Sequence, residues 1–289
     1  SGFEAQPDLL ARIEKRLPLI GNSPAVIQKP KYAPDFFALL TDLNIPHPEV
    51  GFKALDNPEG WLCKEVGGSG GTHVLKAQSG MDLPHGHYYQ RIKPGVPVSM
   101  LFAADGQGIK VVGFNQQWIA PVASKPYRYG GIVGHAELPS AIKQAMQEAA
   151  AKITQAIGLR GMNSLDVVLN ENEFWVLEIN PRLSSTLDLY QSAASNLFDL
   201  HRQAIAGDLS HFPVIPQTAK ARNVLYAMQD LTIPENFAWP EWTADIPMPL
   251  SCIPHEQPIC TVLAEAKTAH EARDLVLARV QQLSELLFH

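Results

Sequence analysis

The stretch FWVLEINPRLSS, residues 174–185, begins like a buried strand and ends in charged and polar side chains. Its apolar start gives way to a carboxylate at Glu178, an amide at Asn180 and a guanidinium at Arg182. Charges at the end of a core strand cost desolvation free energy unless a partner compensates them. Two kinds of partner are open: an ion pair within the chain, or a bound ion together with its ligand.

Residues 165–180, LDVVLNENEFWVLEIN, predict a hairpin of two antiparallel strands. Opposed residues of such a pair share one face of the sheet, and each strand alternates between the faces. We pair Asn170 with Phe174, which leaves a three-residue loop. This register puts Asp166 directly opposite Glu178. The same face is expected to carry Val168, Val176 and Asn180, and the core face Leu165, Val167, Leu169, Trp175, Leu177 and Ile179.

Two carboxylates opposed across a strand pair repel each other and destabilise the pair. A divalent cation between Asp166 and Glu178 would remove this penalty, with Asn180 adding an amide oxygen. Oxygen ligands without His or Cys suit Mg²⁺, which takes its remaining ligands from water and phosphate. The alternative interpretation is that Glu178 pairs with Arg182 while Asp166 faces solvent.

A magnesium ion that serves a phosphate implies a second group of residues that holds the phosphate. The segment GGSGGT, residues 67–72, is flexible enough for its backbone N–H groups to surround an anion. It is not followed by the lysine of a P-loop, so a mobile hairpin tip is the alternative interpretation. Lys64 lies in the apolar strand before this segment and needs an acceptor. Phosphate can be that acceptor, and so can a neighbouring acid such as Glu65.

The 289-residue chain carries a formal net charge of −6, with 46% hydrophobic and 18% charged residues. This balance is typical of a soluble globular protein and argues against a nucleic-acid or membrane-surface partner. The sequence contains no apolar run long enough to span a bilayer. Its three cysteines, Cys63, Cys252 and Cys260, form no CxxC pair, which favours a reducing, cytoplasmic compartment. We interpret the initial Ser-Gly as a tag remnant or a trimmed start.

Apolar spacing predicts both helices and strands along the rest of the chain. Helices are predicted over residues 34–43, from Ser140 to a closing Gly158, and near the C-terminus after a capping box of Thr268 and Glu271. Strands and hairpins are predicted over residues 61–66, 87–92, 98–114 and 165–180. The mixture favours an α+β or α/β architecture with substantially antiparallel sheets.

Taken in their order along the chain, the motifs resemble those of the carboxylate–amine ligases of the ATP-grasp superfamily. Lys31, which precedes the first helix, is similar to the first nucleotide-binding lysine of that superfamily. CKEVGGSGGTHV (63–74) resembles its second lysine and glycine loop, and YYQRIKPG (88–95) resembles its adenine-binding segment. GMNSLDVVLNENEFWVLEINPR (161–182) resembles its magnesium hairpin. Residues 258–280 look like the closing strand and helix of several members.

The resemblance implies an ATP-grasp fold, in which two antiparallel-rich α+β subdomains hold ATP between them. We expect the small subdomain, with the glycine loop, over residues 31–92, and the large one, with the magnesium hairpin, over residues 93–289. Residues 1–30 are too few for the N-terminal domain of the superfamily and would be its remnant. The N-terminal domain would then be largely absent. Either the chain was truncated, or the surface that this domain would provide comes from elsewhere.

The resemblance also implies a nucleotide site. Lys31 and Lys64 would contact the phosphates of ATP. The remaining residues implied to contact ATP are Gly68, Ser69, Gly70 and Gly71 in the glycine loop, and Gln90, Arg91, Ile92 and Val168 around the adenine.

A metal and phosphoryl-transfer site is implied by the same resemblance. Asp166, Glu178 and Asn180 would bind one or two Mg²⁺ ions, with Mn²⁺ as a second candidate metal. Arg182 would hold the transferring phosphate, and Arg182 and Lys64 are the candidate catalytic residues.

The sequence departs from the superfamily at two positions beside this site. Members often carry a ribose-binding carboxylate where this chain has Pro97, so the ribose would be recognised by other groups. Members also often carry an arginine where this chain has Ser164, two residues before the first hairpin acid.

The function implied by the resemblance is an ATP- and Mg²⁺-dependent ligase that joins a carboxylate to an amine through an acyl phosphate, with release of ADP and phosphate. The run YGGIVGH (129–135), the helix after it and the segment GLRGMNSLD (158–166) look similar to the tyramine– or tyrosine–glutamate ligases of methanofuran-type cofactor synthesis. Glutamate is therefore a candidate substrate. Both substrates would be small molecules, without nucleic acid or membrane partners, and a homodimer is a candidate assembly. The alternatives are an ATP-grasp phosphotransferase and a non-catalytic ATP-binding module.

Overall fold

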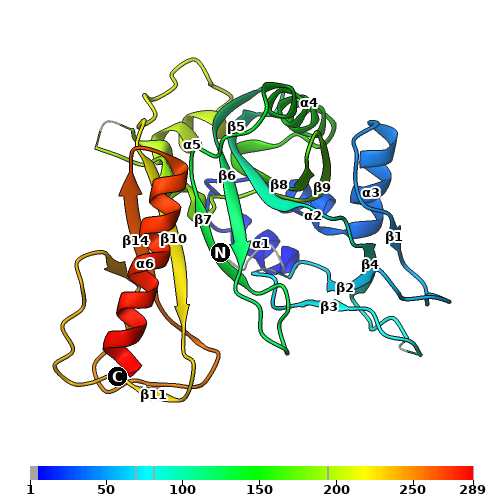
Figure 1. The fold of residues 1–289 in the computed structure, drawn as a ribbon. Coiled ribbons are helices and arrows are strands. Elements are labelled where there is room, and N and C mark those ends of the chain that lie inside the picture. The colour runs from blue at the N-terminus through cyan, green and yellow to red at the C-terminus, as the bar shows by residue number, and fades with distance from the viewer. Residues whose placement is uncertain (1–5, 69, 81, 194, 289) are drawn as a thin grey trace.

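A computed structural model describes residues 6–68, 70–80, 82–193 and 195–288. It contains two main antiparallel sheets, flanked by helices (Figure 1). The helices are α1 (Pro7–Glu14), α2 (Pro24–Lys31), α3 (Ala33–Asp42), α4 (Ser140–Ile157), the 3₁₀ helix η2 (Ser185–Leu189), α5 (Leu197–Ile205) and α6 (Ala269–Phe288). Across these described ranges, no helix is both long and apolar enough to cross a membrane.

The smaller sheet has the strand order β1-β4-β2-β3. Its strands are β1 (Val50–Gly51), β2 (Trp61–Glu65), β3 (Val74–Lys76) and β4 (His87–Arg91). Lys64 of β2 lies opposite Tyr88 of β4, and Leu62 lies opposite Gln90. Because alternate residues share a face, this register puts Lys64 and Gln90 on the same face of the sheet. The glycine loop, residues 66–73, connects β2 to β3.

The larger sheet has the order β12-β14-β10-β7-β6-β5-β8-β9. Its strands are β5 (Val96–Asp105), β6 (Ile109–Ile119), β7 (Tyr129–Val133), β8 (Arg160–Asn170), β9 (Glu173–Asn180), β10 (Ala219–Tyr226), β12 (Thr243–Ala244) and β14 (Pro258–Ala266). A separate pair joins β11 (Leu231–Thr232) to β13 (Cys252–Ile253). The predicted α+β architecture with antiparallel sheets is confirmed.

Helices pack on both faces of the larger sheet. Alternate strand residues point to opposite sides, so both faces present apolar side chains to helices. On one face, the apolar stripe of α4 meets Met100 and Phe102 of β5, and α3 joins this core through Phe36 and Phe37. On the other face, η2 and α5 cover Leu101 and its neighbours. Helix α6 covers β10 and β14 and begins at the predicted capping box, in which Thr268 Oγ1 accepts from the backbone N–H of Glu271 (Figure 1).

The β8–β9 hairpin differs from its predicted register in two ways that cancel at the acid pair. Asn170 pairs with Glu173 rather than Phe174, so the loop is one residue shorter than predicted. A bulge between the pairs Val167–Val176 and Asp166–Glu178 inserts Leu177 as an extra residue and restores the pairing of Asp166 with Glu178.

The core face of the hairpin was therefore predicted incorrectly near its turn. Phe174 and Val176 are buried in the core, whereas Trp175 and Leu177, predicted there, leave it. A one-residue shift in register moves every side chain of that strand segment to the opposite face. Sequence alternation gives no sign of the inserted residue that causes this shift.

Candidate active site

Three polar side chains of the β8–β9 hairpin lie together at its open end. Asp166 and Glu178 are directly opposed, and Asn180 lies opposite Ser164. The Asn180 amide donates from Nδ2 to Asp166 Oδ2 over 3.1 Å and to Glu178 Oε1 over 3.4 Å. The structure thus brings together the trio that the sequence analysis assigned to a metal.

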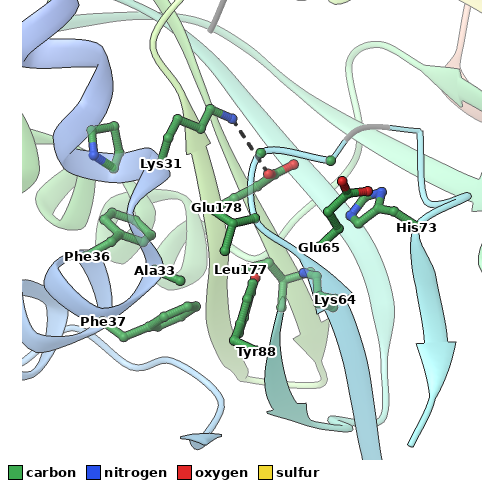
Figure 2. A pocket seen from close by; sticks show the side chains of 14 residues that line it. Lys31, Ala33, Phe36, Phe37, Lys64, Glu65, His73, Tyr88, Leu177 and Glu178 are labelled. Atoms are coloured by element: carbon green, nitrogen blue, oxygen red, sulfur yellow. Dashed lines mark ion pairs between the residues drawn. The ribbon is translucent and has the colours of Figure 1, made fainter. Parts of the chain in front are cut away.

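Lys31, at the end of α2, reaches this trio from a distant part of the chain. Its ammonium donates to Asn180 Oδ1 over 2.9 Å and lies 3.9 Å from Glu178 Oε2. Figure 2 shows Lys31 and Glu178 pointing toward each other, with Leu177 beside them. The structure thus gives Glu178 an ion pair with Lys31, where the alternative interpretation of the sequence expected one with Arg182. Arg182 donates to the Leu183 carbonyl over 3.3 Å, and its charge acts on the Asp166 carboxyl.

The two carboxyl groups have pKa values displaced in opposite directions. Burial raises the pKa of Asp166 well above its usual range, and the neighbouring Glu178 carboxylate raises it further. Burial also acts to raise the pKa of Glu178, but the ammonium groups of Lys31 and Lys64 outweigh it and hold that pKa below its usual value. Protonation is therefore favoured at Asp166 and ionisation at Glu178, because two adjacent carboxylates resist ionising together.

Lys64 and Gln90 extend the polar surface onto the smaller sheet. Lys64 donates from Nζ to Gln90 Oε1 over 3.2 Å and lies over the ring of Tyr88. Glu65, its predicted alternative partner, is the next residue of the same strand and lines a small pocket near His73 (Figure 2). Gln90 is only 2% exposed, and its Nε2 donor has no hydrogen-bond partner among the described residues. A buried donor without an acceptor is what a site for a polar ligand supplies.

A cleft of about 570 Å³ lies between the two sheets. Its volume is in the usual range for sites that bind small molecules and cofactors. Of the predicted site residues, the cleft is lined by Lys64, Gly70, Gly71, Gln90, Arg91, Ile92, Asp166, Val168 and Glu178. Lys31 and Gly68 line a smaller adjoining pocket that shares Lys64, Leu177 and Glu178 with the cleft (Figure 2). Arg182 and Asn180 line neither pocket, and Ser69 lies outside the described residues.

The cleft also includes residues that the sequence analysis did not assign to it. Leu177 enters its wall because of the bulge in β9, and Tyr127 and Tyr129 border it beside the glycine loop. Tyr129 begins the run YGGIVGH, which the sequence analysis noted without giving Tyr129 a role. Only the fold brings it within reach of the loop.

The donor set fits Mg²⁺ better than a metal that prefers nitrogen or sulfur. Within the described ranges, no group of three or more His, Cys, Asp and Glu side chains is arranged to hold a metal ion. Asp166 and Glu178 offer carboxylate oxygens, and Asn180, whose Nδ2 faces the two acids, would turn its Oδ1 toward a metal. The metal would complete its shell with water or phosphate oxygens. Because burial and Glu178 raise the pKa of Asp166, protons would compete with a divalent cation for this pair.

Comparison with known proteins relates this geometry to other chains. The ATP-grasp domain family matches residues 35–186. An uncharacterized protein of Methanocaldococcus jannaschii is 22% identical over 260 residues, which cover 86% of this chain and 64% of that protein. A formate-dependent phosphoribosylglycinamide formyltransferase of Burkholderia lata is 36% identical over 87 residues, 29% of this chain and 20% of that enzyme. The chain thus spans less than two thirds of the length of either relative.

Solved structures of low sequence identity share the fold. An L-amino acid ligase from Bacillus licheniformis superposes with a TM-score of 0.71 at 12% identity, over 97% of this chain and 77% of that one. A carboxyaminoimidazole ribonucleotide synthase from Aspergillus clavatus, in complex with ATP, superposes with a TM-score of 0.71 at 14% identity. The match covers 98% of this chain and 80% of that one. A biotin carboxylase domain from Hydrogenobacter thermophilus, in complex with MgADP and bicarbonate, superposes with a TM-score of 0.72 at 12% identity. The match covers 96% of this chain and 71% of that one. The family match covers more than half of the chain and the fold agrees with it, so this protein belongs to the ATP-grasp family.

Proposed function

We propose that this protein is an ATP- and Mg²⁺-dependent ligase that joins the carboxylate of one small molecule to the amine of another. The reaction would proceed through an acyl phosphate and release ADP and phosphate. The observation that carries the proposal is the contact of Asn180 and the Lys31 ammonium with the acid pair of Asp166 and Glu178, which lines the cleft. A module that only binds ATP does not need so complete a set of oxygen ligands.

The cleft suggests how ATP would be held. Gln90 would turn its unpartnered amide donor toward the adenine, with the backbone of Arg91 and Ile92 beside it and Val168 on the opposite wall. The ammonium groups of Lys31 and Lys64, which already act on Glu178, would hold the phosphates. The backbone of the glycine loop would cover them.

Asp166, Glu178 and Asn180 would hold the magnesium, and Mn²⁺ could take the same oxygen ligands. The bound metal would neutralise charge on the transferring phosphoryl group, which is most of what catalysis of this reaction requires. Arg182, beside the Asp166 carboxyl, would stabilise the same charge from the substrate side. Because burial raises the pKa of Asp166, metal binding would compete with protonation of this carboxyl group.

The remaining assignments are parts of the same proposal. The two sheets suit a division into subdomains at residues 92 and 93. Free cysteines at positions 63, 252 and 260 support a reducing, cytoplasmic setting. The substrates, with glutamate as one candidate, and a homodimeric assembly also remain proposals.

The test is ATP consumption with Mg²⁺ and pooled amino acids and amines, with products identified by mass spectrometry. ADP and phosphate together with a condensed product would support the ligase and identify both substrates. A stable phosphorylated product would instead indicate a phosphotransferase, and AMP with pyrophosphate would contradict both. Binding of Mg-ATP without turnover on any pool would favour an ATP-binding module, and the longer gene product should then be assayed in the same way.

A further inference from the structure

The glycine loop is attached to the larger sheet across the cleft. The backbone N–H of Tyr129, the first residue of β7, donates to the Gly70 carbonyl over 3.0 Å. Gly71 has a φ of +72°, and a Cβ at this position would collide with the Tyr127 carbonyl oxygen. Gly70 has a similar φ of +70°, but a Cβ there would meet open space. Among the described loop residues, Gly70 thus contacts Tyr129 of the larger sheet, and Gly71 allows the close approach to Tyr127 just before it.

The receiving segment is the platform turn, residues 120–128, which connects β6 to β7. Three of its residues contact Glu256, which lies between β13 and β14 and outside the cleft. Ser124 donates its hydroxyl to Glu256 Oε2 over 2.9 Å, and the Lys125 ammonium lies 3.6 Å from the same oxygen. Arg128 donates from Nη1 to the backbone carbonyl of Glu256 over 3.1 Å.

The C-terminal unit, residues 219–288, also holds Tyr129 through its strand β10. The Tyr226 hydroxyl of β10 donates to the Tyr129 carbonyl over 2.8 Å, while the Tyr129 N–H holds Gly70. The guanidinium of Arg128, a residue only 6% exposed, lies 3.7 Å from the centroid of the Tyr226 ring. Glu256 is tied to the end of β10 through its own N–H, which donates to the Ala227 carbonyl over 2.8 Å. The chain of contacts from Glu256 to Gly70 is thus continuous.

We propose that Glu256 is a positioning residue for the glycine loop, acting through the platform turn and Tyr129. It touches no part of the cleft, but it fixes the segment that receives Gly70 and Gly71. The effect on ATP rests on the proposed function, because it requires the loop to cover a bound nucleotide. The effect of Glu256 on the position of the loop does not depend on the proposed function.

The test compares wild-type protein with Glu256→Ala and, as a second variant that removes only one contact, Ser124→Ala. Hydrogen exchange of residues 66–74 is measured without nucleotide, and the Kd of Mg-ATP is measured by calorimetry. Because the carboxylate contacts are exposed, we expect exchange to be about two- to fivefold faster in Glu256→Ala and the Kd to rise by a similar factor. Glu265→Ala is the matched control, since Glu265 lies in the same C-terminal unit but accepts its hydrogen bond from the Thr218 hydroxyl.

A double variant separates positioning from general stability. Gly71→Ala should prevent docking, so Glu256→Ala should add nothing further to loop exchange in that background. Gly80→Ala controls for backbone strain, because Gly80 has a φ of +73° with open space around it.

Unchanged loop exchange in both Glu256→Ala and Ser124→Ala, with the fold intact by circular dichroism, would overturn the positioning role. So would full additivity of Glu256→Ala with Gly71→Ala. If wild-type protein failed to bind Mg-ATP, the proposed function would fall, and the exchange data would still decide the role of Glu256.

Discussion

Asp166 and Glu178 face each other across β8 and β9, and burial and neighbouring charges shift their pKa values in opposite directions. Lys31 and Asn180 contact Glu178, and the charges of Lys31 and Lys64 favour its ionised form. A divalent cation offers a second way to neutralise the pair. Protons and a metal ion would thus compete for the carboxyl groups of Asp166 and Glu178, which links their pKa values to the proposed reaction.

Replacing Glu178 by Gln should abolish Mg²⁺-dependent turnover, by a factor of about 10² or more, because one of two carboxylate ligands is lost. The side chain lies at the cleft rather than in the core, so circular dichroism and the melting temperature should change little. In wild-type protein, Mg²⁺ with ATP should raise the melting temperature, and EDTA should remove that rise. Glu173→Gln, at an exposed position of the same strand, is the control. Turnover that persists in Glu178→Gln would reject the metal assignment.

Replacing Lys64 by Ala should raise the Kd of ATP by about tenfold or more, the usual effect of losing a charged hydrogen-bond donor. Lys76 on the adjacent strand β3 is exposed, and Lys76→Ala should leave the Kd unchanged. Calorimetry with a non-hydrolysable ATP analogue measures both. An unaltered affinity in Lys64→Ala would mean that Lys64 serves only its contacts with Gln90 and Tyr88.

The free energy of unfolding should fall below neutral pH, in part because of His201. Burial lowers the pKa of His201 below its ordinary value of 6.5, although a hydrogen bond to the Ile20 carbonyl opposes this shift. Its Nδ1 accepts the backbone N–H of Met162 over 2.9 Å and must stay unprotonated to do so. The unfolded chain therefore binds this proton more readily than the folded protein. The stabilisation is complete above about pH 6.5 and is lost as the pH falls through the lowered pKa.

Denaturant unfolding between pH 7 and pH 5 measures this effect. His201→Gln should reduce the slope of unfolding free energy against pH by up to about 1.4 kcal/mol per unit. His211→Gln, at a side chain that is 82% exposed, should not change the slope. Partial burial also lowers the pKa of His135, so part of the slope should remain in His201→Gln. An identical slope in wild-type protein and His201→Gln would contradict this account.

The packing of α4 gives a prediction that is independent of function. Met146 is fully buried against the larger sheet, so Met146→Ala should lower the free energy of unfolding by about 2–5 kcal/mol. Gln147→Ala, one residue further along the helix and exposed, should change it by less than about 0.5 kcal/mol. Urea denaturation compares the two. Equal effects would mean that the buried face of α4 has been misassigned.

The sequence allowed the fold to be predicted because its motifs occur in a known order. It also placed Asp166 opposite Glu178, although from a register that is wrong nearer the turn. A three-residue loop and a two-residue loop followed by a bulge give the same pairing at that point. Alternation of apolar residues cannot distinguish these two arrangements, because both keep the acids on one face.

Contacts between distant segments could not be predicted in the same way. The hydrogen bond from Lys31 to Asn180 joins positions 149 residues apart. Its lysine was identified by resemblance rather than by any local pattern. The docking of Gly70 on Tyr129 has no sequence signature, since it depends on where two loops meet after folding. The proposed binding roles of these residues stay predictions until the variants are assayed.

The extra residue in β9 offers a convenient position for directed evolution. Leu177 and Glu178 both line the cleft because of the bulge, whereas neighbours in a regular strand would point to opposite faces. A library at position 177 would therefore reshape the wall beside the acid pair while Glu178 stayed opposite Asp166. A change of size at this one site can be screened for altered nucleotide or substrate preference without redesigning the hairpin.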